Sequence, residues 1–210
     1  MVGQGVLREC LRAADVSEVV VVGRTTLAMN HAKLREVVVA DLFDVAAYED
    51  SLAGFDACFF CLGVSSTGMS EEAYAHITYD LGVAIASTLV RLNQTMTLTY
   101  VSGTGTDSTE LGKVMWARVK GKLENALLGM GFAAAYMLRP GFIAPMDGIQ
   151  SKTPAYRIFY KLLGPLPPHL CRIFPNQILS TREIGRAMLA VARRGYPKHI
   201  LETRDLRAVL

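Results

Sequence analysis

The sequence contains no apolar stretch close to the roughly 20 residues that a helix needs to cross a bilayer. It also shows no basic-then-apolar leader followed by a small-residue cleavage site, so we expect neither an integral membrane segment nor secretion. The four cysteines are too few and too scattered for a disulfide framework (Cys10, Cys58, Cys61 and Cys171). Together these absences predict a protein of the reducing cytoplasm.

Patterns typical of metal and nucleic-acid sites are missing as well. Cys58 and Cys61 form a C-x-x-C pair, but they fall in an apolar run that predicts a strand, where residues three apart point to opposite faces. The four histidines have no ligand spacing with one another or with a carboxylate (His31, His76, His169 and His199). We therefore expect two separate thiols, no metal site and no nucleic-acid partner.

Charge is distributed unevenly along the chain. The formal net charge is +3, but residues 1–150 carry −5 and residues 151–210 carry +8. A basic C-terminal third could attract a phosphorylated cofactor, an anionic substrate or a membrane surface. Because these charges are widely spread, solvated helix faces are the simpler interpretation.

Short β-branched runs alternate with helical patterns along most of the chain. Residues 19–23 (VVVVG) are typical of a strand that is buried on both faces. This alternation predicts one α/β domain, residues 1–210, with a doubly wound parallel sheet and right-handed crossovers. The other expected strands are residues 35–40, 56–63, 97–102, 135–138 and 199–202, and the expected helices are residues 6–14, 71–92, 113–128 and 181–194.

The composition changes after the Arg-Pro-Gly break at residues 139–141. Residues 151–178 hold several prolines among tyrosines and phenylalanines, which predicts an irregular substrate-side lid within the same domain. We expect Ser180 or Thr181 to cap the helix that follows this lid.

The chain opens in the middle of a motif. Residues 1–5 (MVGQG) and the helical pattern after them match the end of a glycine-rich dinucleotide-binding loop, with Gly3 as its last glycine. The apolar strand and the earlier glycines that precede such a loop are absent, so the first strand of the sheet is apparently missing. Either Met1 is an internal methionine of a longer protein, or the chain is an impaired dinucleotide binder.

Two positions after predicted strands bear on the choice of cofactor. An arginine directly after the second strand of such a fold suits the 2′-phosphate of NADP, so Arg24 favours NADP, with NAD as the alternative. Asp41, followed by Leu42, stands where a side chain could meet the adenine amine. The competing interpretations are a solvated arginine at position 24 and a turn or capping aspartate at position 41.

Several stretches in a particular order resemble a known family. They are MVGQGVLREC, VVVVGR, the CLG that ends the fourth strand, YVSGTG, RVKGKLENALL and LRPGFI, and they span nearly the whole chain. In these stretches the chain is similar to atypical short-chain dehydrogenases/reductases, in the NAD(P)-binding epimerase/dehydratase-like group near the Tat-interacting-protein-like oxidoreductases.

This resemblance implies a serine at a strand end and a Tyr-x-x-x-Lys pair on the next helix, where the lysine holds the nicotinamide ribose and lowers the pKa of the tyrosine. Ser102, as hydrogen-bond donor to substrate, and Lys120 fill two of these positions, and Trp116 stands where the tyrosine is expected. Four-residue spacing puts Trp116 and Lys120 on one helix face. The resemblance also implies cofactor contacts beyond the strand ends at Cys61, Leu62 and Gly63.

The tryptophan limits what the site can do. An indole N–H donates a hydrogen bond but does not titrate near neutral pH, so Trp116 cannot act as a general acid or base. Another hydroxyl could substitute (Thr104, Tyr156 or Tyr160), the reaction could dispense with that proton, or the protein could bind NADP without turnover. Trp116 could also stack on a substrate or simply pack on the core.

Two functions from different classes follow. The first is an NAD(P)-dependent oxidoreductase or epimerase/dehydratase that acts on a carbonyl or sugar-like small molecule. The alternative is a non-catalytic dinucleotide-binding sensor or protein-interaction module. In either case we expect a strand of about five or six residues and a Gly-x-x-Gly segment to be encoded before Met1, and weak or no cofactor binding by the 210-residue form.

Overall fold

The computed structural model describes residues 1–149 and 177–210. The predicted lid therefore lies almost entirely outside the described residues, and only its end, from Gln177, is included. The α-helices are α1 (Val2–Arg12), α2 (Glu71–Ala75), α3 (Leu81–Leu92), α4 (Met115–Leu128), α7 (Thr181–Arg194) and α8 (Thr203–Ala208), and a π-helical turn, His76–Asp80, joins α2 to α3. The strands are β1 (Val19–Gly23), β2 (Leu34–Val38), β3 (Ala57–Phe60), β4 (Thr97–Val101), β5 (Ala134–Arg139), β6 (Phe142–Ala144), β7 (Ile178–Ser180) and β8 (Ile200–Glu202).

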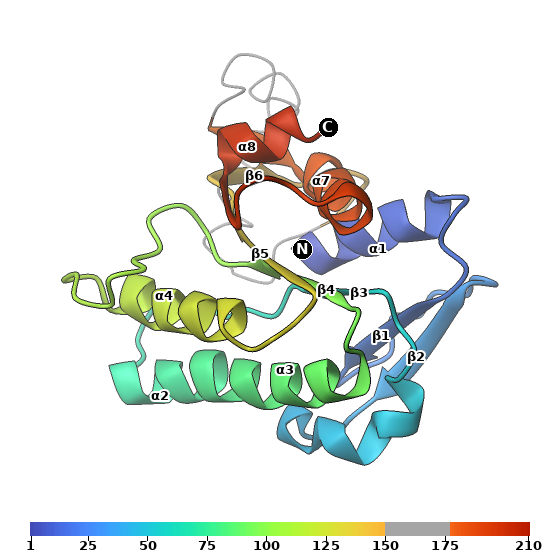
Figure 1. The fold of residues 1–210 in the computed structure, drawn as a ribbon, viewed down its shortest axis with the longest axis horizontal. Coiled ribbons are helices and arrows are strands. Elements are labelled where there is room, and N and C mark those ends of the chain that lie inside the picture. The colour runs from blue at the N-terminus through green and yellow to red at the C-terminus, as the bar shows by residue number, and fades with distance from the viewer. Residues whose placement is uncertain (150–176) are drawn as a thin grey trace.

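The strands form parallel sheets with helices on both faces. A four-stranded sheet has the order β3-β4-β5-β8, β1 pairs with β2, and β6 pairs with β7, every pair being parallel. Figure 1 shows α2, α3 and α4 along one face of the sheet and α1, α7 and α8 on the other. The predicted doubly wound α/β arrangement is confirmed.

Side chains that alternate along the strands divide the core into two layers. On β5, Met137 joins the cluster under α3 and α4, while Leu138 joins the cluster under α1 and α7. Both side chains are fully buried. This alternation follows from the two-residue repeat of an extended strand, and it explains why β5 has an almost continuous apolar sequence.

The sheet is interrupted between β1 and β3, beneath α1. Helix α1 begins beside Cys61, at the carboxyl end of β3, and its other end leads into β1. Strand β1 bonds only to β2, and β3 bonds only to β4. From the pairing of these ladders, Val20 and Val22 of β1 and Ala57 and Phe59 of β3 turn their backbone N–H and C=O groups toward the interruption. The resemblance to a dinucleotide-binding fold predicts the first strand of the sheet at this place.

One expectation about burial is wrong. All five residues of β1 are only partly buried, although the VVVVG run predicts a strand enclosed on both faces. The physical reason is the interruption, because a central strand gains its burial from neighbours on both edges and β1 has a neighbour on one.

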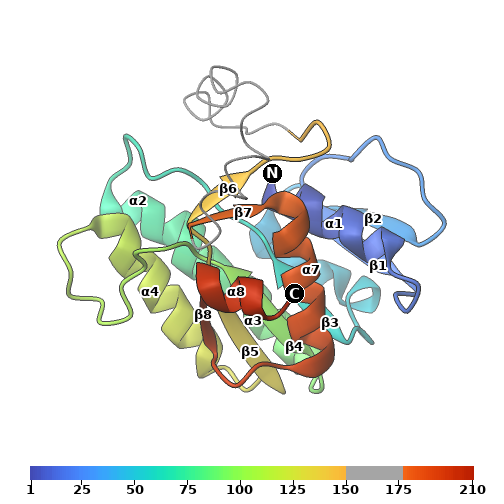
Figure 2. The same cartoon turned by 90° about the horizontal axis from the view of Figure 1, so that it is seen from above.

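The 3-10 helical segment Leu42–Ser51 and three short elements were not expected from the sequence. Strands β6 and β7 have three residues each and pair with one another, and α8 has six residues. Strand β6 starts immediately after the Arg-Pro-Gly break, so this break separates two strands. Figure 2 shows the β6–β7 pair at the edge of the molecule on the same side as the N-terminus.

Helix α7 packs directly on α1, and glycines make the approach possible. A Cβ atom on Gly5 would lie 2.6 Å from the backbone oxygen of Thr181, and one on Gly185 would lie 3.1 Å from the backbone oxygen of Gly5. The start of α7 is capped as predicted, by Ser180, whose hydroxyl accepts from the Glu183 N–H while the Glu183 carboxylate accepts from the Ser180 N–H.

Candidate functional site

The candidate site lies at the carboxyl end of β4, where the chain passes into α4. Ser102 follows β4 directly, and its N–H donates to the Leu138 carbonyl at 2.9 Å, which extends the β4–β5 ladder by one residue. The Lys120 Nζ donates to the backbone carbonyl of Ser102. The structure therefore brings Ser102 and Lys120 together, although they are 18 residues apart.

The hydroxyl of Ser102 is turned toward the interior. It donates to the Glu124 carboxylate, and Ser102 is only 6% exposed. Glu124 is itself fully buried on α4, where the Arg139 guanidinium donates to both of its oxygens, from Nε at 3.1 and 3.2 Å and also from one terminal nitrogen. The Arg139 guanidinium also donates to Ser108 Oγ, at 2.5 Å. Ser102 thus joins a buried polar network, and in this structure its hydroxyl is engaged by Glu124.

Glu124 and Arg139 were not recognised from the sequence. The sequence does contain a signal for Glu124, because it lies four residues after Lys120 and so shares the helix face of that lysine. The role of Arg139 can be recognised only from the packing, since Arg139 ends β5 and reaches Glu124 because α4 lies against that strand. Glu124 supports both candidate residues, because it accepts from Ser102 and its charge acts on Lys120.

Lys120 lies in a mostly desolvated environment on α4. Burial lowers the pKa of its ammonium group below the usual lysine value, and the Glu124 carboxylate opposes that change. A lysine ammonium has three donors, of which the Ser102 carbonyl takes one. The remaining donors can meet hydroxyl groups of a ligand at this edge of the sheet.

Trp116 shares the helix face of Lys120, as the spacing predicts. The Lys120 Nζ lies 6.0 Å from the centroid of the indole ring. The ring also covers Gly105 in the loop before α4, where a Cβ atom would lie 3.5 Å from it. Trp116 is half-buried, so one part of the ring packs on this loop and another part remains accessible.

Residues 62 and 63 lie at the same edge of the sheet as Ser102. Phe60 of β3 is in register with Tyr100 of β4, so Leu62 and Ser102 both stand two residues past that pair. Leu62 is 39% exposed and Gly63 is exposed. Cys61 and Gly3 meet nearby, where a Cβ atom on Gly3 would lie 3.4 Å from the Cβ of Cys61. The first turn of α1 therefore approaches the end of β3.

The two positions proposed for the adenosine end differ in their surroundings. Arg24 follows β1 directly, is exposed, and makes no hydrogen bond or ion pair with the residues that the structure describes. Asp41 accepts from the Phe43 N–H at 3.0 Å and caps a 3-10 helical segment, Leu42–Ser51, in which Leu42 is buried. The structure thus gives Asp41 a capping contact and leaves the Arg24 guanidinium available.

Among the hydroxyls that could replace a catalytic tyrosine, Thr104 is described. Thr104 is exposed in the loop after β4, and its Oγ1 donates to the Arg139 carbonyl at 3.0 Å. Tyr156 and Tyr160 lie outside the described residues.

The thiols show no metal or disulfide chemistry within residues 1–149 and 177–210. Cys58 packs against the core under α3 and α4, and Cys61 packs against the core under α1 and α7, so the C-x-x-C pair is divided between the two faces. Burial raises the pKa of each of these two thiols to about 12. Over the same residues no group of three or more His, Cys, Asp or Glu side chains could hold a metal ion. No described helix is both long and apolar enough to span a membrane.

Comparison with known proteins gives a likeness of fold. No family model and no curated protein sequence matches the chain. It is similar to the Bordetella bronchiseptica enzyme WbmF in complex with NAD+, at 13% identity over 96% of this chain and 69% of that chain, with a TM-score of 0.66.

Two further structures show the same likeness. UDP-N-acetylglucosamine 4-epimerase from Bacillus cereus has 11% identity over 96% of this chain and 71% of that chain, with a TM-score of 0.65. A short chain dehydrogenase/reductase from Saccharomyces cerevisiae has 14% identity over 99% of this chain and 93% of that chain, also with a TM-score of 0.65. The chain therefore has the Rossmann-type fold of the short-chain dehydrogenases/reductases and the related epimerases.

Proposed function

We propose that this protein binds a nicotinamide dinucleotide across the carboxyl edge of its sheet and acts, as an oxidoreductase or an epimerase/dehydratase, on a carbonyl or sugar-like small molecule. The observation that carries the proposal is the placement of Lys120, whose Nζ meets the Ser102 carbonyl at the end of β4 beside the exposed Leu62 and Gly63. In open parallel sheets, ligands bind beyond the carboxyl ends of the strands.

The similar structures support this choice of chemistry. WbmF was also solved with NAD+ and UDP, and another structure with this fold is a glucuronic acid dehydrogenase from Chromohalobacter salexigens. Together with the 4-epimerase, these proteins act on or bind nicotinamide, nucleotide or sugar-acid compounds. We propose the same ligand classes for this chain, on the basis of its shared fold and of Lys120.

Each residue of the site has a distinct proposed role. Lys120 would donate to the ribose hydroxyls of the nicotinamide half, with its ammonium oriented by the Ser102 carbonyl. Leu62 and Gly63 would line the cofactor, and Gly3 would let the first turn of α1 approach the pyrophosphate. The bound nicotinamide would supply hydride transfer. Ser102 would donate to substrate only if its hydroxyl turned away from Glu124, so its role in the observed arrangement is to position Lys120.

We further propose NADP as the preferred form. The Arg24 guanidinium is exposed and has no described partner, and a guanidinium matches the geometry of a 2′-phosphate. Replacing it, as in Arg24→Gln, should weaken NADPH binding while leaving NADH binding nearly unchanged. Equal weakening of both cofactors would contradict the assignment.

Trp116 supports a second candidate function. An indole supplies no proton, and the one candidate hydroxyl among the described residues, that of Thr104, already donates to a backbone carbonyl. A protein with this site could therefore bind the dinucleotide without turnover and act as a sensor or an interaction module.

Consumption of NADPH with a panel of ketones, aldehydes and nucleotide sugars separates the two functions. The assay uses the 210-residue chain and the same chain preceded by a strand and a Gly-x-x-Gly segment. Turnover that disappears in Lys120→Ala but persists in Lys122→Ala supports the enzyme. Lys122 is a matched control because it lies on the same helix, with its Nζ 4.3 Å from the centroid of the Tyr79 ring. Binding without turnover supports the sensor, and turnover unaffected by Lys120→Ala would refute the proposed site.

A further inference from the structure

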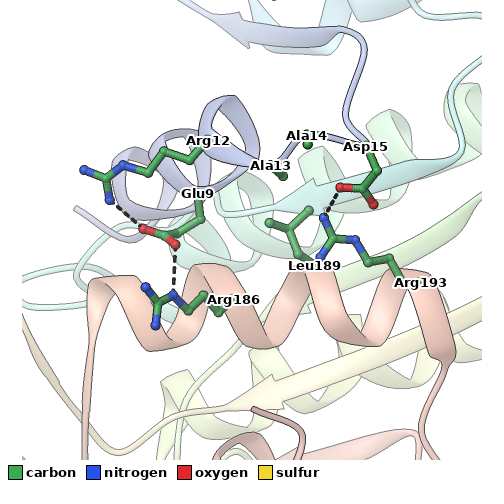
Figure 3. Close-up of a pocket in the computed structure, with 8 residues that line it drawn as sticks. All are labelled: Glu9, Arg12, Ala13, Ala14, Asp15, Arg186, Leu189 and Arg193. Carbon is green, nitrogen blue, oxygen red and sulfur yellow. Dashed lines mark hydrogen bonds and ion pairs between the residues drawn. The ribbon is translucent and has the colours of Figure 1, made fainter.

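A concave surface lies between α1 and α7, away from the candidate dinucleotide site. We call it the arginine groove, and it has a volume of about 340 Å³. It is lined by Glu9, Arg12, Ala13, Ala14, Asp15, Arg186, Leu189 and Arg193. Figure 3 shows Arg12, Glu9 and Arg186 at one end, Asp15 and Arg193 at the other, and Leu189 between them.

Glu9 holds two of the guanidinium groups in place. The Glu9 side chain is 7% exposed and uses both carboxylate oxygens, one accepting from Arg12 Nη1 at 2.9 Å and the other from Arg186 Nε at 3.0 Å. At the other end of the groove Arg193 donates to Asp15. The positions of all three arginines are thus set by carboxylates of α1 and of the turn that follows it.

These arginines use little of their hydrogen-bonding capacity. A guanidinium has five N–H donors, and in the described residues Arg12, Arg186 and Arg193 each use a single nitrogen. Elsewhere the structure satisfies this group more fully, as in Arg182, which donates to Asp147 through both Nε and Nη2. The groove is therefore lined by guanidinium groups from two helices that keep unused donors.

Charge in the groove is also unbalanced. Three guanidinium groups face two carboxylates, and the Lys33 ammonium, which donates to the Ala13 carbonyl at 2.7 Å, adds a further positive charge beside it. Arg12 is 55% exposed and Arg186 is 62% exposed, so these charges are accessible from solvent. An anion can therefore enter without displacing the protein's own ion pairs.

The groove is separate from the proposed dinucleotide site. It is formed by α7, the second half of α1 and the turn leading to β1, whereas Ser102 and Lys120 lie beyond the carboxyl end of β4. Because the strands are parallel and α1 runs back toward their amino ends, the two sites lie at opposite edges of the sheet.

We propose that the arginine groove binds a small polyanion, a metabolite with at least two phosphate or carboxylate groups. Guanidinium groups recognise both kinds of oxyanion through paired N–H donors. The separation of the arginines into two ends favours a ligand with two anionic groups. The apolar lining between them, half-buried Ala13 and exposed Ala14 with the almost fully buried Leu189, accommodates its carbon skeleton. The volume is at the small end of the range for small-molecule sites.

The proposal is tested by titration at constant ionic strength. The probes are pyrophosphate and citrate, with chloride as the reference anion, and binding is measured by calorimetry and by the shift in melting temperature. We expect saturable binding of at least one probe, and the relative affinities distinguish a phosphate ligand from a carboxylate ligand. Loss of one charge-assisted bond should raise the Kd about tenfold or more in Arg186→Gln and in Arg193→Gln.

Two control variants separate binding in the groove from a general effect of positive surface charge and from binding at the cofactor site. Arg91→Gln removes an exposed arginine, 58% exposed and paired through one nitrogen with Glu49, that lies outside the groove. Arg24→Gln removes the arginine proposed to bind the cofactor. Arg91→Gln should bind the probes as the unmodified chain does. Arg24→Gln should lose only binding of a probe at the cofactor site and should keep the saturable binding that depends on Arg186 and Arg193.

An NMR titration of the unmodified chain tests the proposal even if the variants fold poorly. The Nε–Hε NMR signals of Arg186 and Arg193 should shift together during the titration, while that of Arg91 stays constant. Arg193→Gln also leaves both bonds of Glu9 intact, so it disturbs α1 least. The proposal is overturned if neither probe binds saturably, if both groove variants bind as tightly as the unmodified chain, or if Arg24→Gln abolishes binding.

Discussion

Replacing Glu124 by glutamine removes one charge from the network beneath the candidate site while preserving its shape. Glu124 is fully buried, and its partner Arg139 has a side chain that is 12% exposed. The change leaves the Arg139 guanidinium with Glu202 as its remaining carboxylate, 3.7 Å away and 43% exposed. The buried positive charge is then poorly compensated.

Breaking a buried pair in this way costs about 3–5 kcal/mol of unfolding free energy. Because Glu202 supplies partial compensation, we expect a loss near the lower limit, about 3 kcal/mol. For a chain of this size each kcal/mol lowers the melting temperature by about 2–4 °C, so Glu124→Gln should melt about 6–12 °C lower.

Urea unfolding and calorimetry measure this loss, with Glu71→Gln as the matched control. Glu71 pairs with Arg118 at the surface, where its side chain is 51% exposed, so its removal should cost about 1 kcal/mol or less. The double variant Glu124→Leu/Arg139→Met replaces the pair by apolar groups and should recover most of the lost stability. A cost of Glu124→Gln no greater than that of Glu71→Gln, or a double variant less stable than the single one, would refute the role given to the buried pair.

Three further results are expected. Trp116→Tyr supplies a titratable hydroxyl beside Lys120, and in the enzyme it should raise NADPH turnover by about 10²–10⁴; an unchanged rate would exclude a missing acid or base as the limit. The Arg182 guanidinium holds the pKa of Asp147 below its usual value, so this pair stabilises the fold above about pH 4, and its contribution is lost as the pH falls through the lowered pKa. Asp147→Asn should therefore flatten the acid limb of a stability–pH curve, and an identical curve would count against the pair. Adding an apolar strand and a Gly-x-x-Gly segment before Met1 should raise the melting temperature by several degrees and protect the Val20 and Phe59 amides from hydrogen exchange, whereas a matched Gly/Ser extension should do neither.

Strands with β-branched runs were predictable to within a few residues because their burial requires continuous apolar sequence. The apolar run around Val19 predicted the position of β1 correctly but predicted too much burial for it. Burial of β1 depends on a neighbouring strand, which the local sequence does not describe. Strands β6 and β7 were missed because three-residue strands carry too little pattern to distinguish them from a loop.

In the candidate site, too, some contacts could be predicted from the sequence and others could not. Trp116 and Lys120 could be paired from their spacing, because a helix brings residues four apart onto one face. The contact between Glu124 and Arg139 could not, because it depends on how α4 lies against β5. The arginine groove was also beyond the sequence, since Glu9 and Arg186 are 177 residues apart and meet only because glycines let α1 and α7 approach closely.

The most direct test of the dinucleotide site uses the emission of Trp116, the only tryptophan in the chain. NADPH bound beside Lys120 would lie close to this ring and quench it. In the chain extended by a strand and a Gly-x-x-Gly segment, we predict saturable quenching that weakens about tenfold or more in Lys120→Ala and stays unchanged in Lys122→Ala. No quenching in the extended chain, or equal affinity in both variants, would contradict the proposed site.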